Sequence, residues 1–210
     1  MKNPKITVVE YGAGNTGSVS NAFSRLGYSR VKVTSQPEEL LDSQLVVLPG
    51  VGCFGECASN LRSRGLEPVL RQAVFDGGIP ILGICVGMQL LAECSEESEA
   101  HPGLGWIPGS VRKLSPKEGF PVPHVGWNAV HHNDTSTIFS RVPDDSDFYF
   151  DHNYAFNCDS KFVLATASYE VDIVAAIRSE HIFGVQFHPE KSHHNGLRLF
   201  RGLVEAVTNC

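Results

Sequence analysis

The chain has 210 residues, enough to bury one sizeable core, and we expect a single domain over residues 1–210. Its formal net charge of −6 provides no basic field for binding nucleic acid. No stretch approaches the roughly 20 apolar residues of a membrane span, and residues 1–10 lack the apolar run of an export signal. The six cysteines are therefore expected to be reduced thiols, and the sequence predicts a cytoplasmic protein.

The first half of the chain alternates short apolar runs with helix-compatible segments. The runs are continuous and rich in β-branched residues, as expected of strands buried on both faces: residues 6–10, 31–34, 45–48 and 79–84. Amphipathic helices are predicted between them at residues 18–26, 56–64 and 67–76. Strands and helices in alternation predict right-handed crossovers and a parallel sheet.

The second half has short apolar runs at closer spacing, separated by turn residues such as Pro116, Gly119 and Pro143. The runs lie at residues 110–114, 148–150, 162–168, 172–178 and 182–187. They predict a largely antiparallel extension of the same sheet, closed by a helix from about residue 195 to 207. The acidic segment 95–102 is expected to be an exposed loop.

The strongest local motif places Cys85 where a buried strand runs directly into a helix. Gly83 and Gly87 stand two residues before and after it and allow the strand and the helix to approach closely. This pattern is the thiol version of a nucleophile elbow, which presents its side chain at the carboxyl end of a sheet. A buried structural cysteine between two packing glycines would give the same local pattern, so the motif makes Cys85 a candidate nucleophile.

A cysteine nucleophile needs a base, and the base needs a group that orients it. His188 and Glu190 stand two residues apart on an extended segment, so their side chains project to one side. Alone, this short motif is better explained by surface residues at a strand end. About a hundred residues after an elbow, however, it is the layout of a Cys-His-Glu triad.

A turn of small residues follows another buried strand at Gly50, Val51 and Gly52. Such a turn leaves backbone N–H groups free to bind a developing oxyanion, and each donor can lower a barrier by roughly 3 kcal/mol. Turns of this kind are also common without any function. The turn gains significance beside Cys85, because the carboxyl ends of neighbouring parallel strands meet at one edge of a sheet.

Six segments, in the expected order, give the chain a resemblance to a known family. Residues 49–52, 83–89 and 186–192 resemble the motifs of class I (triad) glutamine amidotransferases. Residues 11–15, 123–128 and 149–154 are similar, within that family, to the glutaminase subunits of imidazole glycerol phosphate synthase. The resemblance spans nearly the whole chain. It implies a flavodoxin-like α/β fold with a mostly parallel central sheet, an antiparallel extension and helices on both faces.

The resemblance also implies roles for matching residues in the hydrolysis of glutamine to glutamate and ammonia. Cys85 would attack the side-chain amide, His188 would move the proton, and Glu190 would orient the imidazole. The oxyanion would be held by the backbone of Gly50, Val51, Gly52 and Val86. The rest of the glutamine would be held by Gln89, His152, Asn153 and Tyr154.

Subunits of this kind pass ammonia through a protein interface to a synthase partner. In the histidine pathway that partner is a cyclase-type (β/α)8 barrel, so the resemblance implies a heterodimer. Asn15, Trp127 and Lys191 match motif positions near that interface. The resemblance implies no cofactor.

Three residues depart from the family pattern. Glu10 stands where the family usually has Asp, Thr16 where Leu or Ile is common, and Asn153 where Ser or Thr is usual. The first two lie near the expected partner face. Residues 103–107, 109–112 and 191–196 are similar to a group of paralogues that supply ammonia for amidino-sugars of bacterial surface polysaccharides. That role stays open as the alternative.

Other classes of function have less support in the sequence. Residues 12–17 match the GxGxxG dinucleotide fingerprint, but the second strand ends in residues 34–36 without the acidic residue that binds a ribose. A purely regulatory subunit would not need the complete triad. Three groups suggest a metal: Cys53 with Cys57, His131 with His132, and His193 with His194. None has the paired spacing of a known metal motif, so no metal is expected.

Overall fold

The computed structural model describes residues 3–97, 101–115 and 121–208. Within these ranges the main sheet has nine strands, whose spatial order is β2 (Val31–Thr34), β1 (Ile6–Val9), β3 (Leu45–Gly50), β4 (Ile81–Cys85), β12 (Ile182–Val185), β11 (Val171–Ser179), β10 (Val163–Tyr169), β7 (His124–His132) and β8 (Ser146–His152). The strands from β2 to β12 run parallel. From β12 to β8 each neighbouring pair is antiparallel.

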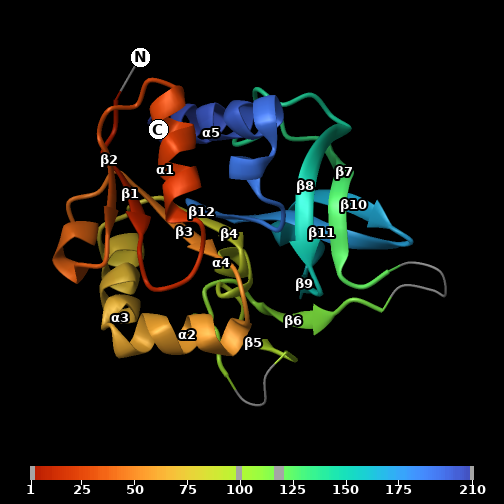
Figure 1. The fold of residues 1–210 in the computed structure, drawn as a ribbon, viewed down its shortest axis with the longest axis horizontal. Helices are drawn as coiled ribbons and strands as arrows, with labels where there is room; N and C mark the ends of the chain where they lie inside the picture. The colour runs from red at the N-terminus through yellow and green to blue at the C-terminus, as the bar shows by residue number, and fades with distance from the viewer. Residues whose placement is uncertain (1–2, 98–100, 116–120, 209–210) are drawn as a thin grey trace.

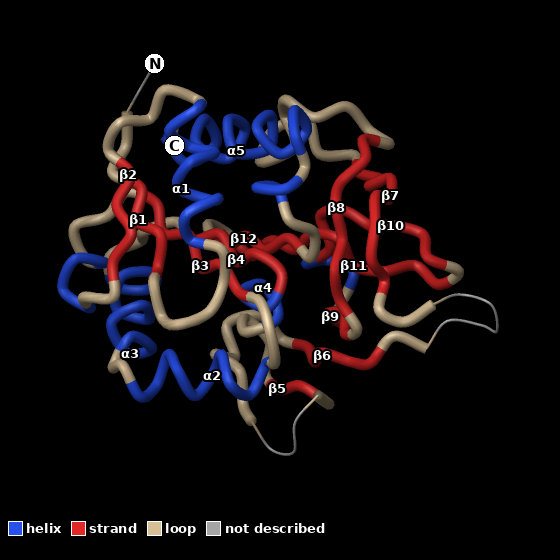
Figure 2. The backbone as a smooth tube through the Cα atoms, viewed as in Figure 1, coloured by secondary structure: helices blue, strands red, loops and turns tan. Residues whose placement is uncertain are grey.

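Helices cover both faces of this sheet. The helices are α1 (Thr16–Arg25), α2 (Phe54–Ser63), α3 (Leu66–Arg71), α4 (Val86–Gln89) and α5 (His193–Thr208). Helices α1 and α5 lie on one face, and α2 and α3 lie on the other (Figures 1 and 2). Strands β1, β3, β4 and β12 are buried at every position between these layers, which explains their continuous apolar sequences.

Helix α1 shows how local sequence sets an element boundary near the predicted site. The side chain of Asn15 accepts a hydrogen bond from the backbone N–H of Ser18 at 3.1 Å and so caps the helix. On its inner face Phe23 packs against Phe200 of α5, with ring centroids 4.4 Å apart. The chain then reverses at Gly27, whose φ of 89° favours glycine.

The predicted antiparallel extension is confirmed for β11, β10 and β8, but the prediction is wrong for residues 110–114. That segment forms β6 (Gly109–Lys113), which pairs with β5 (Cys94–Ser95) and β9 (Tyr154–Cys158) in a separate sheet. The reason is the path of the chain after β8. It turns at Asn153, and β9 then pairs with β6 instead of continuing in the main sheet.

Several local features were not predicted. Strand β7 has a polar sequence containing Gly126, and β9 and β5 are short, so none of them carries a strong strand signal. The helix expected over residues 67–76 is α3 followed by a π-helical turn at Gln72–Asp76. Ser95, expected in an exposed loop, is buried in β5, while residues 98–100 of that loop lie outside the described residues.

The remaining short helical turns are 3₁₀ helices: η1 (Pro37–Leu40), η3 (Ser160–Phe162) and η4 (Pro189–Lys191). The last of these directly follows His188 and begins the chain's path into α5. Over the described ranges, no helix combines the length and the apolar character needed to cross a membrane.

Candidate active site

The nucleophile-elbow geometry predicted around Cys85 is present. Cys85 ends β4 and precedes α4, with φ of 55° and ψ of −112°, a backbone conformation that L-residues rarely adopt. A Cβ at Gly83 would lie 2.5 Å from the carbonyl oxygen of Gly87, and a Cβ at Gly87 would lie 1.8 Å from that of Leu48. Both glycines are therefore required by the close approach of the backbone segments.

His188 and Glu190 follow β12, the strand next to β4 in the sheet. His188 Nδ1 lies 2.8 Å from Glu190 Oε1, and both side chains are 2% exposed. Burial acts to lower the pKa of His188, but the hydrogen bonds and negative charges of Cys85 and Glu190 outweigh it and raise that pKa to about 10. The geometry therefore favours a protonated imidazole beside the sulfur.

A hydrogen-bonded turn fixes the backbone of His188 against the antiparallel half of the sheet. The N–H of His188 donates to the carbonyl of Tyr149 in β8 at 2.8 Å. The hydroxyl of Ser192 donates to the carbonyl of His188 at 2.6 Å and accepts from the N–H of Tyr149 at 3.0 Å. The predicted base is thus anchored to β8, while the predicted nucleophile stands on β4.

A pocket of about 330 Å³ opens over Cys85. Nine of the predicted site residues line it: Val51, Gly52, Cys85, Val86, Gln89, His152, Asn153, Tyr154 and His188. Two others lie outside the lining. Glu190 is hydrogen-bonded to His188, and Gly50 packs against the elbow, where a Cβ would lie 2.6 Å from the nitrogen of Gly87.

Two of the side chains predicted to hold the substrate, Gln89 and His152, contact the same backbone atom, the carbonyl oxygen of Tyr154. Gln89 Nε2 donates to it at 2.9 Å, and His152 Nδ1 lies 2.8 Å from it. A carbonyl oxygen can only accept, so His152 carries its hydrogen on Nδ1. One wall of the pocket is thereby fixed to the start of β9.

Four residues that line the pocket were not predicted: Cys53, Glu97, Pro123 and Asp151. The most informative is Glu97, whose Oε2 accepts a hydrogen bond at 2.7 Å from the N–H of Phe54 at the start of α2. Its carboxylate gives the pocket a negative group. The sequence offers little signal for this role, because Glu97 sits among other acidic residues and is 43 positions away from Phe54.

The residues predicted to face a partner lie around an exposed aromatic group. Trp127 is 48% exposed and stacks on His193, with ring centroids 5.2 Å apart. Tyr149 meets Trp127 edge-on at 6.0 Å, and the Nζ of Lys191 lies 5.2 Å from the centroid of the Tyr149 ring. Asn15 caps α1, which packs against η4, the turn that contains Lys191.

Two of the departures from the family pattern contact each other. Glu10 Oε2 accepts a hydrogen bond from the hydroxyl of Thr16 at 3.0 Å, and its Oε1 accepts one from the N–H of Gly12 at 3.0 Å. Within the loop they close, a Cβ at Gly14 would lie 2.8 Å from Pro49 Cβ. The GxGxxG segment is therefore packed against Pro49 near the end of β3.

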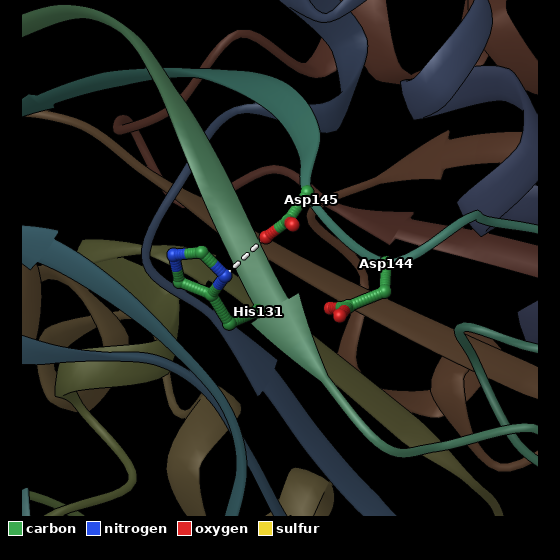
Figure 3. A group of neighbouring side chains, drawn as sticks. All are labelled: His131, Asp144 and Asp145. Carbon is green, nitrogen blue, oxygen red and sulfur yellow. Dashed lines mark ion pairs between the residues drawn. The ribbon is translucent and has the colours of Figure 1, made fainter.

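Away from the pocket, one group of side chains has a spacing compatible with metal ligands. Ligand atoms of His131, Asp144 and Asp145 lie within 4.8 Å of one another, and all three residues are exposed (Figure 3). His131 forms an ion pair with Asp145, and Asp144 accepts a hydrogen bond from the N–H of His132 at 2.7 Å. These contacts account for the proximity without an ion.

Comparisons with known proteins connect this geometry to a family. The model of the family "Glutamine amidotransferase class-I" matches residues 7–205. The imidazole glycerol phosphate synthase subunit HisH 2 of Vibrio vulnificus is 40% identical over 203 residues, covering 97% of this chain and 95% of that protein. The subunit HisH of Moorella thermoacetica is 41% identical over 206 residues, covering 98% and 96%.

Solved structures share the fold at lower identity. A crystal structure of a glutamine amidotransferase has a TM-score of 0.75 at 20% identity and covers 96% of this chain and 98% of its own. A glutamine amidotransferase of Thermotoga maritima has a TM-score of 0.70 at 18% identity and covers 100% of both chains. With the family model extending over almost its full length, this chain belongs to the class I glutamine amidotransferase family.

Proposed function

We propose that this chain is the glutaminase subunit of an imidazole glycerol phosphate synthase, in which it releases ammonia from glutamine for histidine biosynthesis. The observation that carries the glutaminase activity is the arrangement of Cys85, His188 and Glu190 at one pocket, with a buried histidine between a cysteine and a carboxylate. Identities of 40% and 41% to HisH subunits, over nearly the whole chain, support this particular synthase.

In the proposed reaction, the sulfur of Cys85 attacks the side-chain carbonyl carbon of glutamine. His188 gives its proton to the amide nitrogen as the C–N bond breaks, so ammonia leaves and a glutamyl thioester remains. His188 then takes a proton from water, and the resulting hydroxide attacks the thioester and releases glutamate and the sulfur. Glu190 holds Nδ1 of the imidazole, which leaves Nε2 for both proton transfers.

We assign the oxyanion to backbone N–H groups of Val51, Gly52 and Val86, which line the pocket on both sides of Cys85. Gly50, which precedes this turn, packs against the backbone of Gly87 in the elbow. Gly52 has a φ of 98°, and because it lacks a Cβ its peptide can reorient at little steric cost. We propose that binding of the partner and its ligand reorients this turn. Glutaminase turnover that stays unchanged when both are added would exclude this step.

We propose that Glu97 and Gln89 bind different groups of the substrate glutamine. Glu97 offers a carboxylate within the pocket for the α-ammonium group of glutamine. Gln89 donates its amide hydrogens to protein acceptors, to the carbonyl of Tyr154 at 2.9 Å and to Gln186 at 3.0 Å. Its Oε1 therefore remains to accept a hydrogen bond from glutamine, beside the wall formed by His152 and Asn153.

We propose a heterodimer with a cyclase-type (β/α)8 barrel that contacts Asn15, Trp127 and Lys191. Trp127 is 48% exposed and Val125, two residues before it on the same strand, is 51% exposed, so this strand offers apolar surface to a partner. We place the protein in the cytoplasm. The cysteines that the structure describes are free thiols, as expected in a reducing compartment.

The alternative is a paralogous subunit that supplies ammonia for amidino-sugar assembly. The hydrogen bond between Glu10 and Thr16 favours it, because both residues depart from the histidine-pathway pattern close to Asn15. Growth of a histidine-pathway deletion strain separates the two roles. The chain and its cognate barrel should together restore growth without histidine. Failure to do so, with glutaminase activity intact, would favour the paralogous role.

The glutaminase assignment is tested with purified protein and a matched pair of cysteine variants. Cys85→Ala should abolish both glutamate production and covalent labelling by a glutamine-mimicking electrophile. Cys158→Ala removes a half-buried thiol that does not line the pocket, and it should leave both unchanged. Labelling that persists in the Cys85→Ala protein would refute the assignment.

A further inference from the structure

Gln186 is a buried polar residue that the triad does not use. It follows β12, is fully buried, and its N–H donates to the carbonyl of Ala175 in β11 at 2.9 Å. Its side chain lies between two residues of the elbow. Nε2 is 3.7 Å from the sulfur of Cys85, and Oε1 is 3.0 Å from Nε2 of Gln89.

The direction of these contacts follows from one backbone atom. The carbonyl oxygen of Tyr154 can only accept, so Gln89 must present its NH2 group to it. The same NH2 group also donates to Gln186, so Gln186 must accept with Oε1. The NH2 group of Gln186 is consequently turned toward the sulfur of Cys85. If the Gln186 amide were reversed, two NH2 groups would face each other in a buried site, where unpaired donors are costly.

A second contact of the sulfur favours the protonated thiol. The carbonyl oxygen of Asp151 lies 3.9 Å from Sγ of Cys85, a position that accepts from a thiol S–H. The Gln186 NH2 group donates and therefore favours a sulfur that carries a negative charge. The donor is the nearer of the two groups to the sulfur.

We propose that Gln186 is a further catalytic residue, which donates a hydrogen bond from Nε2 to the sulfur of Cys85 and stabilises it as the thiolate that attacks glutamine. This inference rests on the proposed glutaminase function. The sulfur then has two hydrogen-bond donors of different kinds, the charged imidazole of His188 and the neutral amide of Gln186. The amide cannot take the proton back, so it maintains the reactive state without taking part in proton transfer.

Other titratable groups near the sulfur do not supply this stabilisation. Burial raises the pKa of Tyr11 well above its ordinary value and the pKa of Cys57 to about 11, so both stay neutral near pH 7. Glu190 acts through His188, and Glu97 brings a negative charge to the pocket. Among the described residues that line the pocket, His188 is the charged group that favours the thiolate.

The test measures how the rate of Cys85 alkylation by iodoacetamide depends on pH, resolved by peptide mass spectrometry. Gln186→Met removes the donor at similar size, and Gln186→Glu replaces the NH2 group by an acceptor. In both variants labelling should rise at a pH about one unit higher than in the wild type. At pH 7 alkylation of Cys85 should be about threefold slower for each unit by which the profile moves up in pH. A smaller fraction of the sulfur is then thiolate, but the remaining thiolate is intrinsically more nucleophilic, which partly offsets the loss. A pH profile identical to that of the wild type would overturn the proposal.

Two controls make the result specific. Gln72→Met, at an exposed position in the π-helical turn, should keep the wild-type profile. Exposed Cys94 is an internal reference in the same spectra. If wild-type Cys85 labels at no lower pH than Cys94, the proposed nucleophile itself fails. If wild-type Cys85 labels early but the Gln186 variants do so equally, only the role of Gln186 fails.

A measurement on the wild-type protein covers the case in which the variants do not fold. In ¹⁵N-labelled protein, the side-chain NH2 signal of Gln186 should shift when Cys85 is alkylated, because its acceptor is lost. The NH2 signal of Gln44, which is remote from the pocket, should stay in place. A Gln186 signal that does not respond would overturn the proposal as clearly as an unchanged pH profile.

Discussion

Two buried histidine sites lie at the pocket, and one favours a charged imidazole while the other favours neutral ones. His188 is paired with a carboxylate at 2.8 Å, and its pKa is raised to about 10. His152 is paired with another imidazole, that of His124, at 3.0 Å, and burial lowers their pKa values to about 3 and about 4. Burial acts in the same direction at both sites, so the difference comes from the partner: a carboxylate and a sulfur in one case, a neutral ring in the other.

The neutral site is ordered by a chain of hydrogen bonds. His152 donates from Nδ1 to the carbonyl of Tyr154, so its Nε2 accepts from Nδ1 of His124. His124 Nε2 then accepts from the amide of Asn128 at 3.3 Å. The ring of His124 also stacks on Tyr169, with centroids 4.0 Å apart. The first site holds a charged imidazole, as the proposed proton transfer requires, and the second holds neutral rings at one wall of the pocket.

The largest expected effect comes from removing the carboxylate that distinguishes the two sites. Glu190→Gln keeps the shape of the side chain but takes away the charge that helps to hold His188 protonated. Glutaminase activity should fall by roughly 10²–10⁴-fold, as expected for the loss of an orienting carboxylate in a triad. Steady-state assays check this. Glu180→Gln, which alters an exposed carboxylate beside His181, is the control and should retain wild-type activity. Equal activity of the two variants would contradict the assigned role of Glu190.

The second prediction concerns stability at acid pH. His124 and His152 have folded pKa values of about 4 and about 3, below the ordinary value near 6.5, so the unfolded chain binds protons that the folded chain excludes. The free energy of unfolding should therefore fall as the pH is lowered from 6.5 to below 3. Each histidine contributes about 1.4 kcal/mol for each unit by which its pKa is lowered, and the contribution is complete once the pH is below that pKa. Urea titrations at several pH values measure it.

The matched variants for this experiment are His124→Gln and His194→Gln. The first removes one of the buried neutral histidines and should flatten the acid branch of the stability profile. The second changes an exposed histidine and should leave it as steep as in the wild type. His188 contributes with the opposite sign: its raised pKa adds stability below pH 6.5, which is lost as the pH rises toward 10. An acid branch of equal slope in both variants would contradict the neutral state of His124.

A smaller effect is expected from converting the neutral site toward the charged one. Asn128→Asp places a carboxylate beside Nε2 of His124, much as Glu190 lies beside Nδ1 of His188. The pKa of His124 should rise by roughly 1–3 units, measured by NMR titration of its ring protons. Asn128→Ala is the control, because it removes the amide without adding charge. If both variants titrate alike, the carboxylate is not what separates the two sites.

Much of the parallel half of the fold could be predicted from the sequence. Strands β1, β3 and β4 are continuous apolar runs, and the elbow carries the glycines that its backbone contacts require. Strand β7 could not be predicted, because its outward face includes Trp127 and its inward face includes the polar His124. These residues interrupt the apolar alternation by which a half-buried strand is recognised.

The triad was predicted because its members fall in two short motifs. The roles of Glu97 and Gln186 could not be predicted, because each depends on contacts between distant parts of the chain. Glu97 bonds to Phe54, 43 residues away, and Gln186 lies beside Cys85, 101 residues away. Spacing within a motif does not encode such contacts, which arise only when β4 and β12 are paired and the loop after β5 folds back.

The acceptor that orients both Gln89 and His152 is the main-chain oxygen of Tyr154. Point substitutions replace side chains and leave that oxygen in place, so evolution can vary residue 154 without reversing either amide or imidazole. Only a change in the path of the chain, such as an insertion or deletion at the turn around Asn153, would move it. The polarity of the pocket is therefore robust to substitution and fragile to changes in loop length.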